Sequence, residues 1–169
     1  MGVMGWRDAE RWWADIVGGT VVTDQRKQLE DIDVEAGLTW SVKCSPAVAR
    51  YNNFSFETEL ERSDTGERVP GNFALCRAQG YVIVVPPWDL AYTWRSGELK
   101  TLVAAKKYPV KSLTAQTEAN NAGRRYDRSW NIIVPVRDLA PFASTWHLPT
   151  PGDIKEETSA SAWMLGWPS

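Results

Sequence analysis

Residues 30–43 read EDIDVEAGLTWSVK, and this stretch decides the fold that the sequence predicts. Apolar and polar residues alternate on both sides of a short turn near Ala36-Gly37, which is typical of two half-buried strands. We therefore expect a hairpin made of strands 32–34 and 39–43. Its apolar face consists of Ile32, Val34, Trp40 and Val42.

The polar face of this hairpin gathers charged side chains. If the turn centres near Leu38, Asp33 lies opposite Lys43 and Glu35 lies opposite Ser41. On an exposed face, Asp33 and Lys43 would form an ordinary surface salt bridge, worth about 0–1 kcal/mol. The same two side chains also suit a site that handles charge, so both interpretations stay open on the residues alone.

A helix is predicted before the hairpin, over about residues 5–17, and Gly18-Gly19 ends it. On the helical wheel Glu10 falls beside the apolar stripe, so its carboxylate either faces inward or reaches water at the edge of the stripe. The apolar residues at helical spacing are Trp6, Ala9, Trp13, Ile16 and Val17.

Later segments complete the predicted sheet. Residues 54–60 alternate strictly, so we expect a third strand that extends the hairpin sheet and carries Glu57 and Glu59 opposite its two Phe. The order of elements predicts an α/β (α+β) fold with one mixed central sheet flanked by helices. We expect a single domain over residues 1–150 and a tail over residues 151–169. The other expected elements are a strand at 20–22, a short helix at 72–79, a strand buried on both faces at 81–85, a helix at 96–107 and a buried strand at 130–134.

The composition of the 169-residue chain narrows its chemistry. A single His, His147, and two Cys, Cys44 and Cys76, cannot supply the four side chains of a Cys/His zinc cluster. Catalysis assisted by histidine would rest on His147 alone, and no nucleophile motif stands near it. The remaining chemistry uses carboxylates, Lys, Ser or a hard metal ion. No apolar run approaches the length of a membrane span, and charges interrupt the N-terminus, so we expect a cytoplasmic protein without a membrane partner.

The net charge of −2 hides an uneven distribution. Residues 1–85 carry nine Lys and Arg against 13 Asp and Glu, whereas residues 91–128 carry eight against three. Two ordinary solvated faces would explain this, as would a protein that holds a cation at its acidic part and phosphates at its basic part. The candidate phosphate-binding residues are Lys106, Lys107, Arg124, Arg125 and Arg128. Tyr108, Tyr126 and Trp130 are candidates to stack on unpaired bases, with packing in the core as the alternative for Trp130.

The order of these motifs resembles the PD-(D/E)XK nuclease superfamily, whose members include restriction endonucleases, Holliday-junction resolvases and small phage-encoded nucleases. The resemblance rests on a helix with an inward Glu, an acid in a strand (Glu30-Asp31-Ile32-Asp33-Val34) and a hairpin return that ends in Ser41-Val42-Lys43. It covers about residues 5–90 and implies a restriction-endonuclease-like core.

The resemblance also implies roles for individual residues. Glu10 assists the site from the helix, Asp33 is the principal ligand of Mg²⁺ or Mn²⁺, and Lys43 positions the attacking water. Ser41 departs from the pattern, because the family has Asp or Glu there. Glu57 is then expected as a catalytic residue and second metal ligand in its place, with Glu35 as the alternative.

The first functional hypothesis is that the chain is a metal-dependent DNA endonuclease, structure-selective and phage-encoded. Such a protein would work in the host cytoplasm, and a homodimer is one expected state because nucleases that cut both strands are usually two-fold dimers. The second hypothesis is a catalytically inactive protein on the same fold that binds nucleic acid or inhibits a host defence protein. A third is a structural domain in which Trp-rich surfaces, including Trp163 and Trp167, drive assembly.

Overall fold

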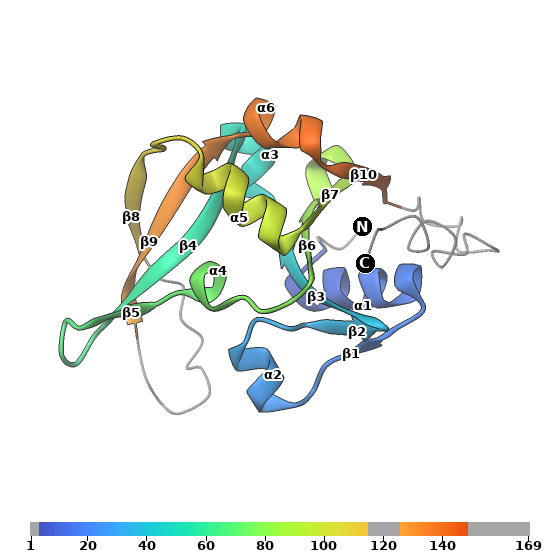
Figure 1. Cartoon of the computed structure of the whole chain (residues 1–169), viewed down its shortest axis with the longest axis horizontal. Coiled ribbons are helices and arrows are strands. Elements are labelled where there is room, and N and C mark those ends of the chain that lie inside the picture. The colour runs from blue at the N-terminus through green and yellow to red at the C-terminus, as the bar shows by residue number, and fades with distance from the viewer. Residues whose placement is uncertain (1–3, 115–125, 149–169) are drawn as a thin grey trace.

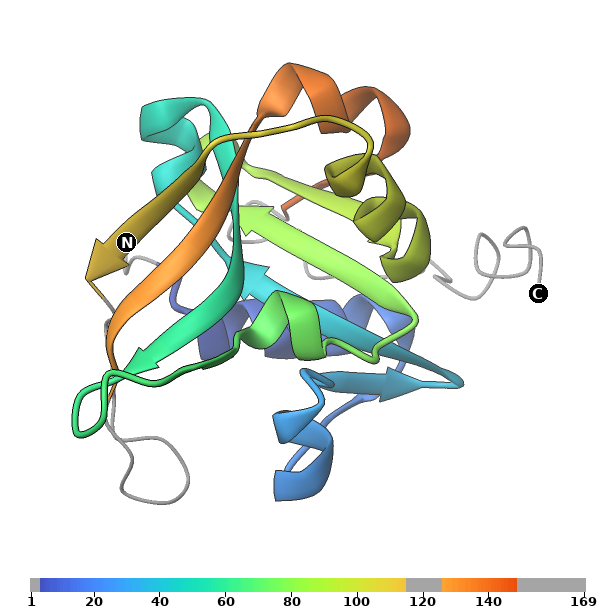
Figure 2. The same ribbon diagram turned by 60° about the vertical axis from the view of Figure 1, so that its left-hand side comes forward.

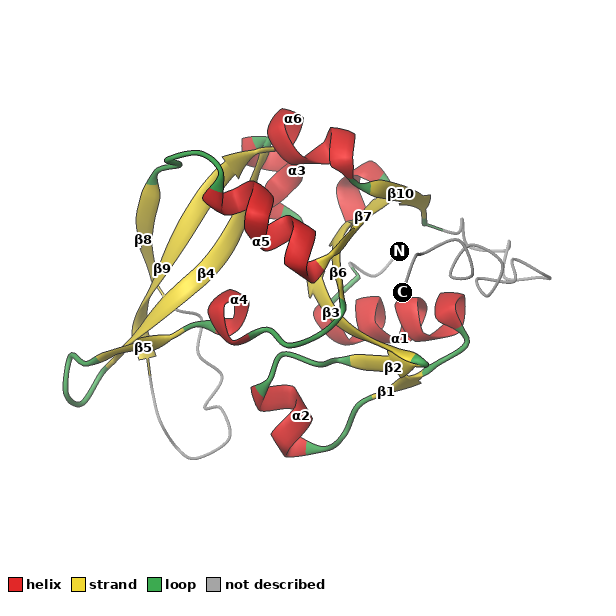
Figure 3. Ribbon diagram, in the orientation of Figure 1, coloured by secondary structure: helices red, strands yellow, loops and turns green. Residues whose placement is uncertain are grey.

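The computed structural model describes residues 4–114 and 126–148. Figure 3 distinguishes their helices from their strands. The helices are α1 (Trp6–Val17), α2 (Gln25–Leu29), α3 (Ala47–Tyr51), α4 (Asn72–Leu75), α5 (Ser96–Ala104) and α6 (Val136–Leu139), with 3-10 turns η1 (Pro86–Trp88) and η2 (Ala140–Phe142). The strands are β1 (Thr20–Val21), β2 (Val34–Ala36), β3 (Leu38–Cys44), β4 (Asn53–Arg62), β5 (Arg68–Pro70), β6 (Gly80–Val85), β7 (Leu90–Arg95), β8 (Val110–Thr114), β9 (Tyr126–Pro135) and β10 (Ser144–His147).

The described part of the chain has a mixed α/β fold with a mixed central sheet and flanking helices. The central sheet has the strand order β1-β2-β3-β6-β7-β10, in which β3 and β6 are parallel and the other neighbours antiparallel. A second, antiparallel sheet has the order β5-β4-β9-β8. In Figures 1 and 2, α1 lies on one side of the central sheet, and the second sheet lies with α5 and α6 on the other.

The burial of β6 on both faces explains this layering. Successive side chains of a strand point to opposite faces, and both faces of β6 are covered. Val82 and Val84 belong to the apolar cluster that α1 closes with Ala9 and Trp13. Tyr81, Ile83 and Val85 belong to the other cluster, which packs against Phe54 and Phe56 of β4 and Leu99 of α5. The prediction of a strand buried on both faces at 81–85 is confirmed.

A glycine in β6 leaves room for a buried tryptophan of the neighbouring strand β3. Gly80 of β6 lies directly opposite Trp40 of β3 in the parallel register. A Cβ atom at position 80 would overlap the six-membered ring of Trp40, which is fully buried. Only glycine therefore fits beside this indole without a shift of the backbone or the ring.

The hairpin is present, but its register differs from the expected one. Gly37 adopts a φ of 75°, so the turn centres on Gly37 and places Glu35 opposite Thr39. The expected pairings of Asp33 with Lys43 and of Glu35 with Ser41 are therefore wrong. Ile32 belongs to the apolar cluster that includes Phe54 and Phe56, and not to the cluster that α1 covers, because β2 begins only at Val34.

The strand at 54–60 does not extend the hairpin sheet. It forms the middle of β4, which pairs with β5 and β9 in the second sheet, so the expectation of one sheet is wrong. The helix at 5–17 is confirmed as α1, whereas α4 and α5 end earlier than expected, at Leu75 and Ala104. The expected tail at 151–169 lies outside the described residues. No helix among the described residues has the length and apolar character needed to cross a bilayer.

Candidate functional site

The site forms where β2 leaves the edge of β3. Because β2 begins at Val34, opposite Trp40, the part of β3 that follows Trp40 has no β2 neighbour. The backbone N–H of Val42 donates instead to the side-chain Oδ2 of Asp33, at 2.7 Å. The short β2 thus leaves a gap at the sheet edge, and the Asp33 carboxylate is fixed inside that gap.

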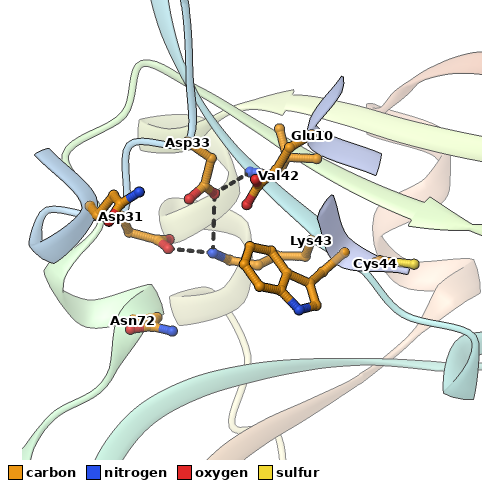
Figure 4. A pocket seen from close by; sticks show the side chains of 9 residues that line it. Glu10, Asp31, Asp33, Val42, Lys43, Cys44 and Asn72 are labelled. Carbon is orange, nitrogen blue, oxygen red and sulfur yellow. Dashed lines mark hydrogen bonds and ion pairs between the residues drawn. The ribbon is translucent and has the colours of Figure 1, made fainter. Parts of the chain in front are cut away.

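Lys43 lies between two carboxylates. Its Nζ donates to Asp31 Oδ1 and lies 3.5 Å from Asp33 Oδ2 (Figure 4). Burial acts to lower the pKa of Lys43, but the charges of Asp31 and Asp33 outweigh burial and hold that pKa well above its ordinary value. The side chain, which is 28% exposed, therefore remains an ammonium at neutral pH and cannot serve as a general base.

The turn after α2 brings Asp31 into the site. The Asp24 side chain caps α2 by accepting from the backbone N–H groups of Arg26 and Lys27. Asp31 then adopts a φ of 57°, which turns its carboxylate inward until only 4% of the residue is exposed. The fully buried Ser41 hydroxyl donates to Asp31 Oδ2 at 2.7 Å.

Glu10 enters the site from α1. Burial, followed by the negative charge of Asp33, raises the pKa of the Glu10 carboxyl to about 7, although Lys43, Arg7 and Arg11 act in the opposite direction. Glu10 is half-buried and lines the pocket of this site, so its carboxylate faces the site and still reaches water. Asp33 is thus close enough for its negative charge to act on the Glu10 carboxyl.

These side chains line one pocket with a volume of about 310 Å³. Figure 4 shows dashed lines from the Lys43 ammonium to both Asp31 and Asp33, with Glu10 near Asp33. Three carboxylates against one ammonium give the pocket a negative balance, which favours a cation as its first ligand. The lining residues are Trp6, Glu10, Gln28, Asp31, Asp33, Val42, Lys43, Cys44 and Asn72.

Glu57, the expected second metal ligand, lies on β4 and is not among the lining residues. Its Oε1 accepts from the backbone N–H of Asn72 at 3.2 Å. Burial raises its pKa, and the charges of Lys43 and Asp31 also act on it, so Glu57 lies close to the site. Glu35, the expected alternative, accepts from Lys27 Nζ at 2.7 Å instead.

The expected phosphate-binding residues that the structure describes do not line this pocket. Lys106 and Lys107 follow α5 and are exposed, and Lys106 Nζ lies 3.5 Å from Asp138 Oδ2. Arg128 is exposed on β9. Arg124 and Arg125 lie outside the described residues.

Sequence reasoning missed Asp31 as a site residue. Asp31 precedes β2 and reaches the site through a backbone φ of 57°, which the alternation of apolar and polar residues does not indicate. Its contact with the Ser41 hydroxyl places a carboxylate beside the position where the resembled family carries its second acid.

No protein-family model, curated protein or solved structure matches this chain.

Whether the pocket suits a metal ion depends on the side chains that could bind it. Within the described ranges, no three or more His, Cys, Asp or Glu side chains are grouped so that they alone could hold a metal ion. Two carboxylates, Glu10 and Asp33, still suit Mg²⁺, which usually binds one or two carboxylates and takes its other ligands from water and substrate phosphate.

Proposed function

We propose that the chain is a metal-dependent phosphodiesterase that cleaves DNA, on a variant of the restriction-endonuclease-like core. The observation that carries the proposal is the position of Lys43, a permanent ammonium held by Asp31 and Asp33 in a pocket that Glu10 also lines. The parallel pair of β3 and β6 beside the hairpin is consistent with that core.

Glu10 and Asp33 are the residues that would hold Mg²⁺ or Mn²⁺. As neighbouring anions they repel each other, and a divalent cation relieves that repulsion. The cation supplies a bound water of lowered pKa and positive charge at the phosphate oxygens. Glu57 is less suited as a ligand, because its carboxylate already accepts from Asn72 and is not among the residues that line the pocket.

Lys43 offsets the negative charge that develops on the phosphate and orients the attacking water through its N–H groups. Asp31 is a positioning residue that acts through Lys43. Because Asp31 binds the Lys43 ammonium, the ammonium stays in position even when the Asp33 carboxylate binds a cation. The buried Ser41 hydroxyl fixes the second oxygen of the Asp31 carboxylate, so this acid compensates for the acid missing at position 41.

The experiment is a cleavage assay on linear duplex, single-stranded and branched DNA and on RNA, with Mg²⁺, Mn²⁺ or chelator. We expect the wild type to cut DNA only with a divalent ion, and Asp33→Asn and Glu10→Gln to lose that cutting. Folded wild-type protein that cuts no substrate in the panel would refute the proposal.

A second function is favoured by Ser41 itself. Its hydroxyl is engaged by Asp31 and is buried, so position 41 offers no ligand to a cation. A protein that keeps the fold and binds nucleic acid or a host defence protein without hydrolysis would have the same feature. It is distinguished by binding of the panel oligonucleotides with equal affinity in Mg²⁺ and in chelator, without product.

A further inference from the structure

The indole of Trp6 lies at the pocket without belonging to the apolar core. Trp6 is the first residue of α1 and is 49% exposed, whereas Trp13 and Trp40 are fully buried. It lines the pocket and stands four residues before Glu10, so both side chains lie on the same face of the helix. Neither apolar cluster of the described residues includes it.

We propose that Trp6 is a stacking platform for an unpaired nucleobase next to the phosphate that the pocket binds. This inference rests on the proposed function and specifies its substrate: the strand is unpaired at the nucleotide beside the cleaved bond. A base inside a duplex is covered by its neighbours on both faces, whereas an unpaired base offers a free face to an indole.

Electrostatics gives a second reason for this assignment. The chain carries a net charge of −2, and the pocket lining has more carboxylates than ammonium groups, so general attraction to phosphate is weak. Affinity must then come from contacts that do not depend on many Lys and Arg. A stacked base is such a contact. The guanidinium carbon of Arg7 lies over one face of the Trp6 ring, 4.9 Å from its centre, so the base would stack on the opposite face and Arg7 adds one local positive charge.

Tyr51 provides a matched control. It is 60% exposed, and the guanidinium carbon of Arg50 lies 5.2 Å from its ring centre, so its surroundings imitate those of Trp6. Tyr51 belongs to α3 and does not line the pocket. A general effect of exposed aromatic residues on nucleic-acid binding would therefore appear at both positions, and an effect of the pocket only at Trp6.

The experiment measures binding of a labelled single-stranded 12-mer, and of the same sequence as a blunt duplex, by fluorescence anisotropy with Ca²⁺ in place of Mg²⁺. We expect Trp6→Leu to weaken binding of the single strand about tenfold and to leave duplex binding unchanged. Trp6→Phe keeps a ring and should stay within about threefold of the wild type. Tyr51→Leu should bind both oligonucleotides as the wild type does.

Three results would overturn the inference. If Trp6→Leu binds the single strand as well as the wild type does, or weakens single strand and duplex equally, Trp6 stacks no unpaired base, while cleavage by the wild type in Mg²⁺ keeps the proposed function intact. If the folded wild type neither binds nor cuts any oligonucleotide, the proposed function fails and the inference fails with it.

Discussion

The carboxylate of Asp31 bonds both the Lys43 ammonium and the Ser41 hydroxyl, so one buried acid from the turn after α2 fixes two side chains of β3. This relationship makes Asp31 the residue on which the geometry of the pocket depends. Asp31 is 4% exposed and Ser41 is 0% exposed, so water replaces these bonds poorly when one partner is removed.

Asp31→Asn should destabilise the fold and lower activity. The change leaves the Lys43 ammonium with Asp33 alone of its two carboxylate partners, so we expect a loss of about 2–3 kcal/mol in the free energy of unfolding, measured by urea denaturation. Glu35→Gln is the control, because it breaks the Lys27–Glu35 pair, whose side chains are 45% and 36% exposed. That change should cost less than about 1 kcal/mol. Equal losses in the two variants would contradict the role of Asp31.

Divalent-ion affinity should depend on pH through Glu10. Its pKa of about 7 in the metal-free protein means that protons and the cation compete for this carboxylate. A group with that pKa is roughly 10% ionised at pH 6 and 90% at pH 8, so Mn²⁺ affinity should rise about tenfold over this range. Calorimetry measures the change, and Glu10→Gln should bind more weakly with a flat profile. A wild type whose affinity does not change between pH 6 and pH 8 would exclude Glu10 as a ligand.

The same pKa predicts how stability changes with pH without metal. The pKa is about 7 in the folded chain and 4.5 as the ordinary value. The folded protein therefore holds this proton more tightly than the unfolded chain, and its stability falls as pH rises from 4.5 to 7. Relative to Glu10→Gln, the wild type should lose about 1–2 kcal/mol over this window, after allowance for solvent screening. A difference between the two proteins that stays constant with pH would refute the raised pKa.

Ser41→Asp restores the acid of the resembled family but should not restore a better metal site. The new carboxylate would meet the Asp31 carboxylate in a space where Ser41 is 0% exposed. We expect a loss of about 2–4 kcal/mol, larger at pH 8 than at pH 5 because a proton relieves the repulsion. Ser41→Asn has the same size without the charge and should lose less at pH 8. Tighter Mn²⁺ binding by Ser41→Asp at unchanged stability would show that position 41 faces the pocket.

Gly80→Ala tests the packing that holds β3 in place. Its methyl group would overlap the Trp40 ring, so we expect a loss of about 1–3 kcal/mol in thermal or urea unfolding. Gly97→Ala is the control, because nothing lies within 4 Å of a Cβ there and alanine favours the helix. Gly80→Ala should cost less free energy of unfolding in a protein that carries Trp40→Leu than in the wild type, because the smaller side chain leaves room for the methyl group. No coupling between positions 40 and 80 would contradict the close approach.

The sequence predicted the elements that local periodicity controls. The apolar stripe of α1 and the continuous apolar run of β6 each gave the correct element, because burial in these segments follows one regular period. Glu10 was placed correctly near the site for the same reason. The hairpin was found, but its register was not, because a single positive φ at Gly37 decides which residues face each other.

The second sheet could not be predicted in the same way. β4 pairs with β9, more than 60 residues later, and alternation within residues 54–60 does not show which partner a strand takes. The inward turn of Asp31 depends on one backbone conformation after α2, which no period reveals. Strand β7 carries a local signal, because Tyr92 and Trp94 alternate with Ala91 and Thr93, although no strand is predicted there.

The most direct test of the account is the rate of DNA hydrolysis in Mg²⁺ by the wild type, Lys43→Met and Lys27→Met, each shown to be folded by circular dichroism. Lys27 is the matched control, because it also pairs with a carboxylate but does not line the pocket. The account predicts that Lys43→Met loses at least about 100-fold in rate, as expected when a group that stabilises the transition state is removed. Lys27→Met should keep the wild-type rate. Hydrolysis that persists in Lys43→Met, or that falls equally in both variants, would contradict the assignment of this pocket as the active site.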